Sequence, residues 1–543
     1  VCEEGVSFWG GIDPKNGQII DQHHPNHGEL ISDRFVLMPV SRGSCSGSGV
    51  LLQLARSGLA PAALVFRDQE DILTLGSIIA AKLFNCPVAV LRLGCEAYDL
   101  LSTASVAEIK NDTLYYLNRC LKLNVVNTKS LDLTEIDQNI LKGNHGEAKK
   151  IAMEVICFMA AMQGANKLID VSRAHIDGCI LAHDANLDFA EKMFELGAKT
   201  TIPTTMNAIS VDKENWQSQQ MPYEFGIKAN RLADIYIKMG AQPTFTCAPY
   251  LLDNPPGRNE DIAWSESNAV VFANSVLGAR TQKHGDYLDL CIAITGRAPR
   301  TGVYLNENRM PSCEILVTLP ENFDDALWPM LGWLAGIKSP NAIPILTGLE
   351  LISSTNDDLK ALCAAFGTTS AAPMLHVNGH TPESQMIRPS HSKRLKITVT
   401  DLRNLWKKFN VGSSQIDLVA IGSPHASSIE CQKFAHFLEG NETARTTKTV
   451  ITVGRATLSE IKDEGIFRQL ECAGVQVMSD ICWCSMTEPF FPQNSTSFMT
   501  NSGKYAHYGK GLSGRNVRFG SLRDCATASI TGQTFQGLPD WLM

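Results

Sequence analysis

The sequence predicts a multi-domain α/β protein, and three observations support this fold class. Short apolar runs rich in β-branched residues alternate with segments of helical periodicity, as at 62–66, 72–84 and 87–93. The chain has 543 residues, which is too long for one hydrophobic core and indicates two to four domains. Its composition, 44% hydrophobic and 19% charged, is ordinary for a globular enzyme.

Charge and cysteine usage exclude several classes of protein. The formal charge of -8 and the absence of a basic tract argue against a nucleic-acid partner. No apolar run reaches membrane-spanning length, since 76–93 is interrupted by Lys82 and Asn85, and no signal peptide is visible. The 16 cysteines have irregular spacings typical of reduced thiols. We therefore expect a cytoplasmic monomer that acts on a small molecule.

The first predicted α/β unit contains a Gly/Ser loop between a strand and a helix. A strand at 35–40 is followed by SRGSCSGSG at 41–49 and then by a helix-like apolar run. The hydroxyls of Ser44, Ser46 and Ser48 and the N–H groups of the helix start suit an anion, although a flexible turn with an N-cap explains the loop equally well. Strand and helix alternate as far as 93, and a helical and then polar pattern at 97–133 predicts the connection to a second body.

Side chains of functional type follow the strand predicted at 168–171. Its carboxyl end delivers Arg173, His175 and Asp177. Open α/β sheets bind ligands at that end of their strands, so contact with a substrate and a structural role are equally favoured for this group.

The segment at 263–286 contains a predicted helix that opens with Glu266, Ser267 and Asn268. The helix carries small residues, which permit close packing and need no function, toward Arg280. Arg280, in contrast, offers a bidentate fork for a carboxylate.

Two cysteines lie just beyond the predicted strand at 475–478. The strand ends at Asp480, and Cys482 and Cys484 follow. A single residue between two cysteines is a weak metal signal, and buried core cysteines are the favoured interpretation of this pair taken alone.

The stretch TNSGKYAHY at 500–508 has the pattern of a Gly turn. It would present Asn501, Ser502 and Lys504 to an anion. An ordinary surface loop is an equally good interpretation.

Two further cysteines lie in predicted positions that suit a metal-binding thiolate. Cys247 ends a predicted strand next to Pro249, which would fix its geometry as a metal ligand requires. Cys525 lies in the first turn of a predicted helix with Ser521 as N-cap, where the helix dipole favours a thiolate.

Long segments resemble a known family. Two N-terminal segments resemble the small swivelling domain of the aconitase X family, namely VSFWGGIDPKNGQIIDQHHP and SRGSCSGSGVLLQLARSGLAPAALV. The chain from LDLTEIDQNILKGNHGEAKK to the C-terminus resembles the large subunit of that family. The resemblance implies an aconitase-like α/β/α catalytic body at 131–543, built from repeated α/β units. A small N-terminal swivelling α/β domain at 1–130 would precede it.

The resemblance also implies roles for single residues. The catalytic base of the family's Gly-Ser loop corresponds to Ser44, whose alkoxide would need a cation such as Arg42 or Lys504; Lys504 is the alternative base. Thr205 and Asn207 match a Thr-Thr-x-Asn segment that binds a carboxylate. The expected substrate-binding residues are Arg42, Ser46, Ser48, His175, Asp177, Thr205, Asn207, Glu266, Ser267, Asn268, Arg280, Asn501 and Ser502.

An iron–sulfur cluster is the cofactor that the resemblance implies. The family's Cys-x-Pro-Tyr, Asp-x-Cys and Ser-Leu-x-x-Cys segments place its ligands at Cys247, Cys482 and Cys525. A 2Fe–2S cluster is expected, and 3Fe–4S and 4Fe–4S remain open. Many relatives have Thr where this chain has Ile481, so a hydroxyl beside the cluster is absent.

The implied activity is removal of water from a small hydroxy acid. Single-chain members of the family resemble cis-3-hydroxy-L-proline dehydratase, which yields 1-pyrroline-2-carboxylate, and two-chain members resemble mevalonate 5-phosphate dehydratase. This chain is of the fused type, so the imino acid is the expected substrate and the phosphate ester the alternative. An RNA-binding role is disfavoured by the acidic balance.

Overall fold

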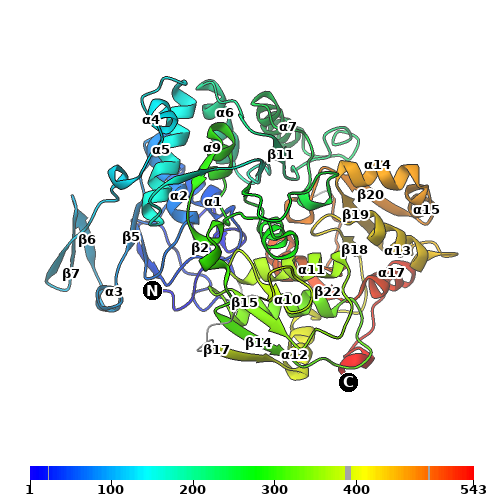
Figure 1. Ribbon diagram of the computed structural model, residues 1–543. Coiled ribbons are helices and arrows are strands. Elements are labelled where there is room, and N and C mark those ends of the chain that lie inside the picture. Colours follow the sequence, from blue (N-terminus) through cyan, green and yellow to red (C-terminus); the bar gives the residue numbers. More distant parts are fainter. Residues whose placement is uncertain (22–23, 386–392, 487–489) are drawn as a thin grey trace.

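The computed structural model describes residues 1–21, 24–385, 393–486 and 490–543. Parallel sheets flanked by helices follow one another along the chain, which confirms the predicted α/β class. Figure 1 shows the N-terminal sheets (blue) and the C-terminal elements (orange and red) on opposite sides of the molecule.

The N-terminal domain is built on the parallel sheet β3–β4–β5, whose two faces bury alternate side chains. Leu64 and Phe66 pack in the core that includes residues of α1 and α2, and Ala63 and Val65 face α3 and a small antiparallel sheet. The elements are β1 (Ile12–Asp13), β2 (Gln18–Ile19), β3 (Phe35–Met38), α1 (Gly47–Arg56), β4 (Ala63–Phe66), α2 (Ile72–Phe84), β5 (Ala89–Arg92) and α3 (Cys95–Ser102).

The segment after α3 differs from its predicted helical pattern. It forms the antiparallel meander β6 (Ala107–Lys110), β7 (Thr113–Tyr116) and β8 (Arg119–Lys122). Tight turns explain the difference, because Asn111, Leu117 and Asn118 adopt positive φ angles between strands of only four residues.

The next unit contains the parallel sheet β11–β10–β12. The strand predicted at 168–171 is β9, which pairs with β13, and a separate strand, β10, carries His175 and ends before Asp177. The elements are α4 (Glu135–Leu141), α5 (Glu147–Met162), β9 (Leu168–Asp170), β10 (Ala174–Ile176), α6 (Asp184–Glu195), β11 (Thr204–Met206), α7 (Tyr223–Lys238), β12 (Ala263–Trp264), α8 (Ser267–Phe272), α9 (Leu288–Thr295) and β13 (Arg297–Pro299).

A third unit holds the four-stranded parallel sheet β16–β15–β14–β17. Its helices α10 and α11 pack on each other, and α11 also contacts α8 of the preceding unit. The elements are β14 (Cys313–Val317), α10 (Leu327–Lys338), β15 (Pro344–Thr347), α11 (Asn356–Thr369), β16 (His376–Val377), β17 (Lys393–Ile397) and α12 (Val399–Phe409).

The C-terminal unit holds a parallel sheet in the order β20–β19–β18–β21–β22. The strand order reverses between β18 and β21, and ligands of such sheets bind in the crevice at the carboxyl ends of the strands where this happens. The elements are β18 (Leu418–Ile421), α13 (Ser428–Leu438), β19 (Lys448–Val453), α14 (Arg455–Asp463), α15 (Ile466–Cys472), β20 (Val475–Ser479), β21 (Ser497–Thr500), α16 (Gly503–Ser513), β22 (Asn516–Phe519) and α17 (Leu522–Thr531).

One large hydrophobic core joins the units. It runs from Leu75 and Ile79 of α2, through α5 and α10, to Phe498 of β21. Within the described parts of the chain, no helix combines the length and apolarity needed to cross a membrane.

Candidate active site

The carboxyl ends of β10, β11 and β12 deliver three polar side chains to one place. Asp177 follows β10, Asn207 follows β11 and Glu266 stands two residues after β12. The Asn207 amide donates to the carboxylate of Asp177 and, at 3.2 Å, to Glu266 Oε2. The parallel strands therefore bring together residues that are far apart in sequence.

Glu266 and Lys504 form a buried ion pair. Lys504 Nζ lies 2.7 Å from Glu266 Oε1, which also accepts a hydrogen bond of 2.7 Å from the Asn268 amide. Burial alone would raise the pKa of Glu266, but the charge and hydrogen bond of Lys504 outweigh it and lower the pKa to about 2. Glu266 is thus a carboxylate at neutral pH.

Asp177 belongs to a buried acidic group with Asp286 and Asp289. Burial raises the pKa of Asp177 well above its usual value, and the charges of Asp286, Glu266 and Asp289 raise it further. Burial, followed by the neighbouring Asp289, raises the pKa of Asp286 to about 7, and burial raises that of Asp289 to about 6. This group therefore holds protons near neutral pH.

The Gly/Ser loop of the N-terminal domain reaches this place from the other side. Ser44 and Ser46 line the same cavity, and their Oγ atoms are 3.3 Å apart. Gly43 precedes them at φ +90°, where an added Cβ would lie 2.3 Å from Ser7 Oγ, so the turn requires glycine. The Ser46 N–H also points to Ser44 Oγ at 3.3 Å.

Lys283 anchors the loop to the body. Its buried ammonium donates to the carbonyl oxygens of Gly43, Gly367 and Ser370 at 2.9, 3.2 and 3.3 Å. The loop is also attached through Cys45, whose thiol lies 2.8 Å from the Ser265 carbonyl oxygen. The position of the loop thus depends on residues that the sequence did not single out.

The C-terminal sheet supplies the third side of the site from its reversal point. Lys504 follows β21, and Cys484 follows β20; both line the cavity with Asp177 and Glu266. The loop after β18 is tied to the start of α16, because the Ser502 hydroxyl donates to the Ser423 carbonyl. Three chain regions therefore enclose one small cavity of about 30 Å³.

Three thiols gather beside this cavity. Cys247 Sγ and Cys482 Sγ are 3.7 Å apart, and the thiol of Cys484 contacts that of Cys482. This contact, together with burial, raises the pKa of Cys484 well above its usual value. Sulfurs bound to one tetrahedral metal ion at about 2.3 Å are about 3.8 Å apart, so the spacing of the first two fits such an ion.

The thiol of Cys484 is not arranged as a metal ligand in this structure. Among the residues that the structure describes, no three His, Cys, Asp or Glu side chains already enclose a metal ion. Cys247, Cys482 and Cys484 nevertheless share one cluster with Ala208, and soft thiolates suit iron. The donor set fits an iron–sulfur group provided that the Cys484 side chain turns toward it.

Cys525 is not brought to these thiols. Ser521 caps α17 as predicted, but Cys525 is buried in a different core, on the side of the C-terminal sheet that holds Cys431 and Phe434. Burial and the charges of Asp524 and Asp325 raise its pKa well above the usual value, so the expected helix-dipole stabilisation of a thiolate does not prevail. The structure thus places Cys484, and not the predicted Cys525, beside Cys247 and Cys482.

Two predicted substrate cations lie elsewhere. Arg42 points away from the catalytic cavity and pairs with Glu4 at 2.7 Å and Asp21 at 3.2 Å. Arg280 donates to the Tyr304 carbonyl at 3.0 Å and to the side chains of Asn259 and Asn306. Local partners therefore occupy both guanidinium groups.

Several predicted binding residues have supporting contacts instead. His175 is fully buried with Nδ1 2.8 Å from Thr205 Oγ1, and neither residue lines the cavity. Ser48 Oγ donates to the carbonyls of Cys45 and Ile72. Ser502 caps α16 by accepting from the Tyr505 N–H at 3.0 Å.

Of the other predicted substrate-binding residues, some line the cavity and others do not. Ser267 and Asn268 line the cavity, whereas Asn501 does not. Asn268 also donates to the Cys247 carbonyl at 3.0 Å, which links the acidic group to the thiols.

Sequence reasoning missed other cavity residues, namely Trp9, Thr368 and Tyr508. The stretch TNSGKYAHY could have indicated Tyr508, because Tyr508 lies one helical turn after Lys504 on α16 and so on the same face. Trp9 and Thr368 carry no local pattern, because their placement depends on the packing of the N-terminal domain against α11.

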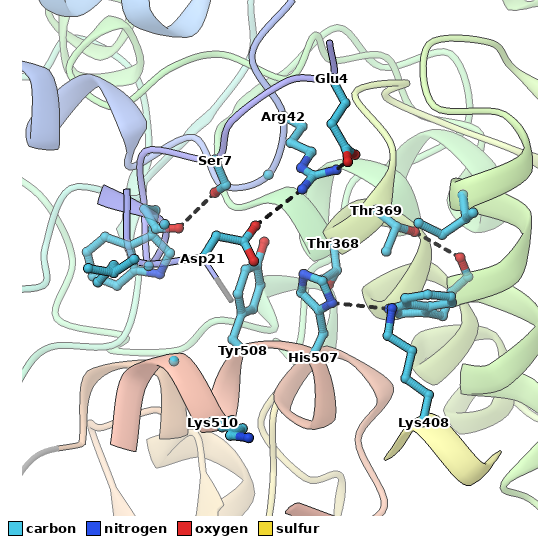
Figure 2. A pocket seen from close by; sticks show the side chains of 18 residues that line it. Glu4, Ser7, Asp21, Arg42, Thr368, Thr369, Lys408, His507, Tyr508 and Lys510 are labelled. Atoms are coloured by element: carbon cyan, nitrogen blue, oxygen red, sulfur yellow. Dashed lines mark hydrogen bonds and ion pairs between the residues drawn. The ribbon is translucent and has the colours of Figure 1, made fainter. Parts of the chain in front are cut away.

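A larger cavity of about 260 Å³ adjoins the catalytic one. Figure 2 shows it between Glu4, Asp21 and Arg42 on one side and Tyr508, His507 and Lys510 of α16 on the other. Trp9, Thr368 and Tyr508 line both cavities, so they form the partition between them.

Family models match nearly the whole chain. The aconitase X swivel domain matches residues 1–116, the aconitase X first domain 130–307, the second domain 311–407 and the third domain 416–531. These bounds correspond to the N-terminal domain and to the three units that follow it.

Individual relatives cover similar lengths. Cis-3-hydroxy-L-proline dehydratases of Hypocrea jecorina and Pseudomonas aeruginosa are 41% and 43% identical over 99% of this chain and 94% and 95% of their own. The phosphomevalonate dehydratase large subunit of Methanocaldococcus jannaschii is 30% identical over 72% of this chain and 98% of its own. The crystal structure of Thermococcus kodakaraensis aconitase X (holo-form) matches with a TM-score of 0.68 and 31% identity, over 74% of this chain and 100% of that one.

Proposed function

The chain belongs to the aconitase X family, and from that membership we propose that it is a hydro-lyase that removes water from cis-3-hydroxy-L-proline. Water leaves as the C2 proton and the C3 hydroxyl, and the resulting enamine tautomerises to 1-pyrroline-2-carboxylate. The observation that carries the proposal is the meeting of Ser44, Asp177, Glu266, Lys504 and Cys484 at one cavity.

Ser44 is the proposed base that takes the C2 proton. A serine hydroxyl is a weak acid, so its alkoxide must be stabilised by hydrogen-bond donors and a cation. The Ser46 N–H and hydroxyl lie 3.3 Å from Ser44 Oγ, and the ammonium of Lys504 lines the same cavity. Arg42, which is paired outside, has no part in this step.

Cys247, Cys482 and Cys484 are the proposed ligands of an iron–sulfur cluster, with 2Fe–2S as its proposed type. When bound there, such a cluster supplies a Lewis acid for the leaving hydroxyl. The chain itself holds the thiols close to Glu266 and Lys504, with Cys247 and Cys482 buried and Cys484 lining the cavity.

The ligand assignment predicts opposite results for two cysteine variants. Cys484→Ala should lower bound iron well below the wild-type stoichiometry and bleach the visible absorption. Cys525→Ala should keep both, because that thiol lies in another core. Iron per chain and the visible spectrum measure the difference, and the reverse pattern would restore Cys525 as the ligand.

The charges at the cavity favour a zwitterionic substrate over a phosphate ester. Lys504 is the only Lys or Arg among the described residues that line it, and Asp177 and Glu266 are acidic. A phosphate dianion normally requires two or more cations or a helix N-terminus. An imino acid needs one clamp for its carboxylate, here Lys504 with Ser267 and Asn268, and an anionic acceptor for its ammonium, here the Glu266 carboxylate.

The substrate test offers cis-3-hydroxy-L-proline, its trans isomer and mevalonate 5-phosphate to the purified, iron-loaded protein in separate reactions. Detection of the cyclic imine with o-aminobenzaldehyde should give colour with the cis isomer alone. Consumption of the phosphate ester, with no imine from either proline, would refute the substrate and retain the dehydratase activity.

A further inference from the structure

His425 connects the two loops that carry Cys247 and Cys482. It is fully buried in the loop after β18. Its backbone N–H donates to Cys247 Sγ at 3.3 Å, its Nδ1 is 3.2 Å from Thr246 Oγ1, and its Nε2 is 2.8 Å from the Ile481 carbonyl oxygen. The His425 ring therefore contacts Thr246, the neighbour of Cys247, and Ile481, the neighbour of Cys482.

The contacts define which ring nitrogen carries the proton. A backbone carbonyl can only accept, so Nε2–H donates to Ile481 and Nδ1 accepts from the Thr246 hydroxyl. The two bonds point in different directions from one rigid ring. They fix the distance between Thr246 and Ile481, and with it the 3.7 Å between the two sulfurs.

A second set of contacts holds the backbone of the His425 loop. The buried ammonium of Lys360 points to the His425 carbonyl at 3.4 Å and pairs with Asp357 at 3.0 Å and with Glu430. Glu430 in turn accepts from the Ser427 N–H at 2.9 Å. The loop is thus braced on the side away from the thiols.

We propose that His425 is a positioning residue that sets the spacing and reactivity of the Cys247 and Cys482 thiols. Its ring holds the two loops in register, and its N–H, aimed at Cys247 Sγ, withdraws electron density from that sulfur. Hydrogen bonds to ligating sulfurs raise the reduction potential of iron–sulfur groups. The part of the inference that concerns iron rests on the proposed function, and the part that concerns the thiols does not.

The test compares three variants of the full chain. His425→Phe removes both ring bonds and keeps the backbone N–H. His425→Gln restores one side-chain donor toward Ile481. His376→Phe is the matched control, since His376 is equally buried and its Nε2 is 2.7 Å from the Arg309 carbonyl, in another unit.

The first readout is the iodoacetamide labelling rate of Cys247 and Cys482 in iron-free protein, measured by mass spectrometry of peptides. Labelling should rise about tenfold in His425→Phe, the effect of losing about one buried hydrogen bond, and return to within about threefold of wild type in His425→Gln. His376→Phe should label as wild type does. Equal labelling in the two Phe variants, or no rescue by Gln, would overturn the proposal.

The second readout is the midpoint potential of the iron-loaded protein, which should fall in His425→Phe, because without the ring bonds the loop no longer holds its N–H at Cys247 Sγ, and should not change in His376→Phe. Wild-type protein that takes up no iron would refute the proposed cofactor, while the labelling rates would still decide the role of His425. The two failures are therefore distinguishable.

The larger cavity carries a second, independent inference. It is about 260 Å³, larger than the catalytic cavity of about 30 Å³, and is separated from it by Trp9, Thr368 and Tyr508. A small acid that reaches the catalytic cavity from this side must pass the partition that these three residues form.

Lys408 gives this outer cavity its attraction for a carboxylate. On the N-terminal side Arg42 is paired with two carboxylates, those of Glu4 and Asp21, so that the described residues lining this side carry no free positive charge. Across the cavity the ammonium of Lys408 lies 4.8 Å from the Trp333 ring centre, and the charges of Asp21, Arg42 and Glu4 act on it from the N-terminal side. Figure 2 shows Lys408 on the side opposite the Arg42 cluster.

We infer that this cavity is an entry chamber in which Lys408 captures the carboxylate of a small zwitterionic acid before the catalytic cavity opens. The inference rests on the proposed function for the identity of the acid. Electrostatic capture of this kind acts on the association step and weakens with salt.

Lys408→Met keeps the apolar stem against Trp333 and removes the charge. With cis-3-hydroxy-L-proline at low salt, kcat/KM should fall about threefold to tenfold while kcat stays unchanged, and added salt should reduce the difference. Lys407→Met is the matched control, since Lys407 is the adjacent exposed residue of α12 and does not line the cavity. Equal kinetics of the two variants would overturn the entry chamber, whereas absence of turnover by wild type would instead refute the proposed function.

Discussion

Asp286 couples the protonation of the acidic group to the stability of the fold. Its pKa is raised to about 7 by burial and by Asp289, above the value of about 4 expected in the unfolded chain. Between these two values the folded protein binds more protons than the unfolded one, so the free energy of unfolding decreases as pH rises from about 4 to about 7.

Asp286→Asn should make this part of the pH profile less steep. The variant lacks one of the three buried acids whose raised pKa values favour the folded state at low pH, while Asp177 and Asp289 keep part of the slope. Urea unfolding at several pH values between 4 and 7 measures it. Asp253→Asn, a substitution at an exposed aspartate, is the control; identical slopes in wild type and Asp286→Asn would contradict the assignment.

Single residues also mark the limit of sequence reasoning. Glu266 could be predicted because it opens a helix that the sequence indicates, whereas Asp177 follows β10 and not the predicted strand at 168–171, and Lys504 lies in α16 and not in a Gly turn. Arg280 and Cys525 look equally functional in sequence, but their destinations depend on which neighbours satisfy a guanidinium or bury a thiol. The partners of these two side chains depend on the packing of the folded chain, which the sequence pattern does not show.

At the scale of elements, the start of α16 links stability to the site. Ser502 caps α16 two residues before Lys504, and its hydroxyl also donates to the Ser423 carbonyl. Ser521 caps α17 through a capping box, away from the cavity. The two caps have similar chemistry and different neighbours, which allows the effects of stability and position to be separated.

Ser502→Ala and Ser521→Ala should each lower the free energy of unfolding by about 1 kcal/mol, the usual cost of losing an N-cap. Ser502→Ala should in addition lower kcat, because Lys504 is no longer held against Glu266. Denaturant unfolding and steady-state kinetics on both variants test this. A similar loss of kcat in both would mean that only stability matters.

Elements were predicted best where burial gives an unbroken pattern. The helix expected at 72–84 is α2, and the strands expected at 62–66 and 475–478 are β4 and β20. The pattern failed at β6, β7 and β8, which are four residues each and half exposed. Short strands between Asn-containing turns carry too few buried residues to distinguish a period of 2 from one of 3.6.

At the scale of the whole molecule, Lys283 ties the N-terminal domain to the body. Its ammonium bridges the Gly43 carbonyl of the catalytic loop and two carbonyls at the end of α11. Burial lowers its pKa, and the nearby Cys45 opposes that effect. Lys283 therefore contributes to closure of the domain, together with the Cys45 contact and the core shared by α2 and α5.

Lys283→Met should favour the open arrangement, because three buried carbonyls lose their donor. Small-angle scattering should give a larger radius of gyration for the variant than for wild type. Lys82→Met is the control, since Lys82 also connects the two parts, through an exposed pair with Glu154 that contributes about 1 kcal/mol or less. Unchanged scattering by Lys283→Met would show that closure rests on other contacts.

The most direct test of the account is the turnover of cis-3-hydroxy-L-proline by Ser44→Ala beside Ser48→Ala. Ser44 lines the catalytic cavity, whereas Ser48, in the first turn of α1 after that loop, bonds only to backbone carbonyls. With iron content and unfolding checked in both, Ser44→Ala should lower kcat by about 10²- to 10⁴-fold, the usual effect of removing a positioned base, and Ser48→Ala should retain most of it. Wild-type kcat in Ser44→Ala would contradict the central claim that this loop delivers the base to the cavity.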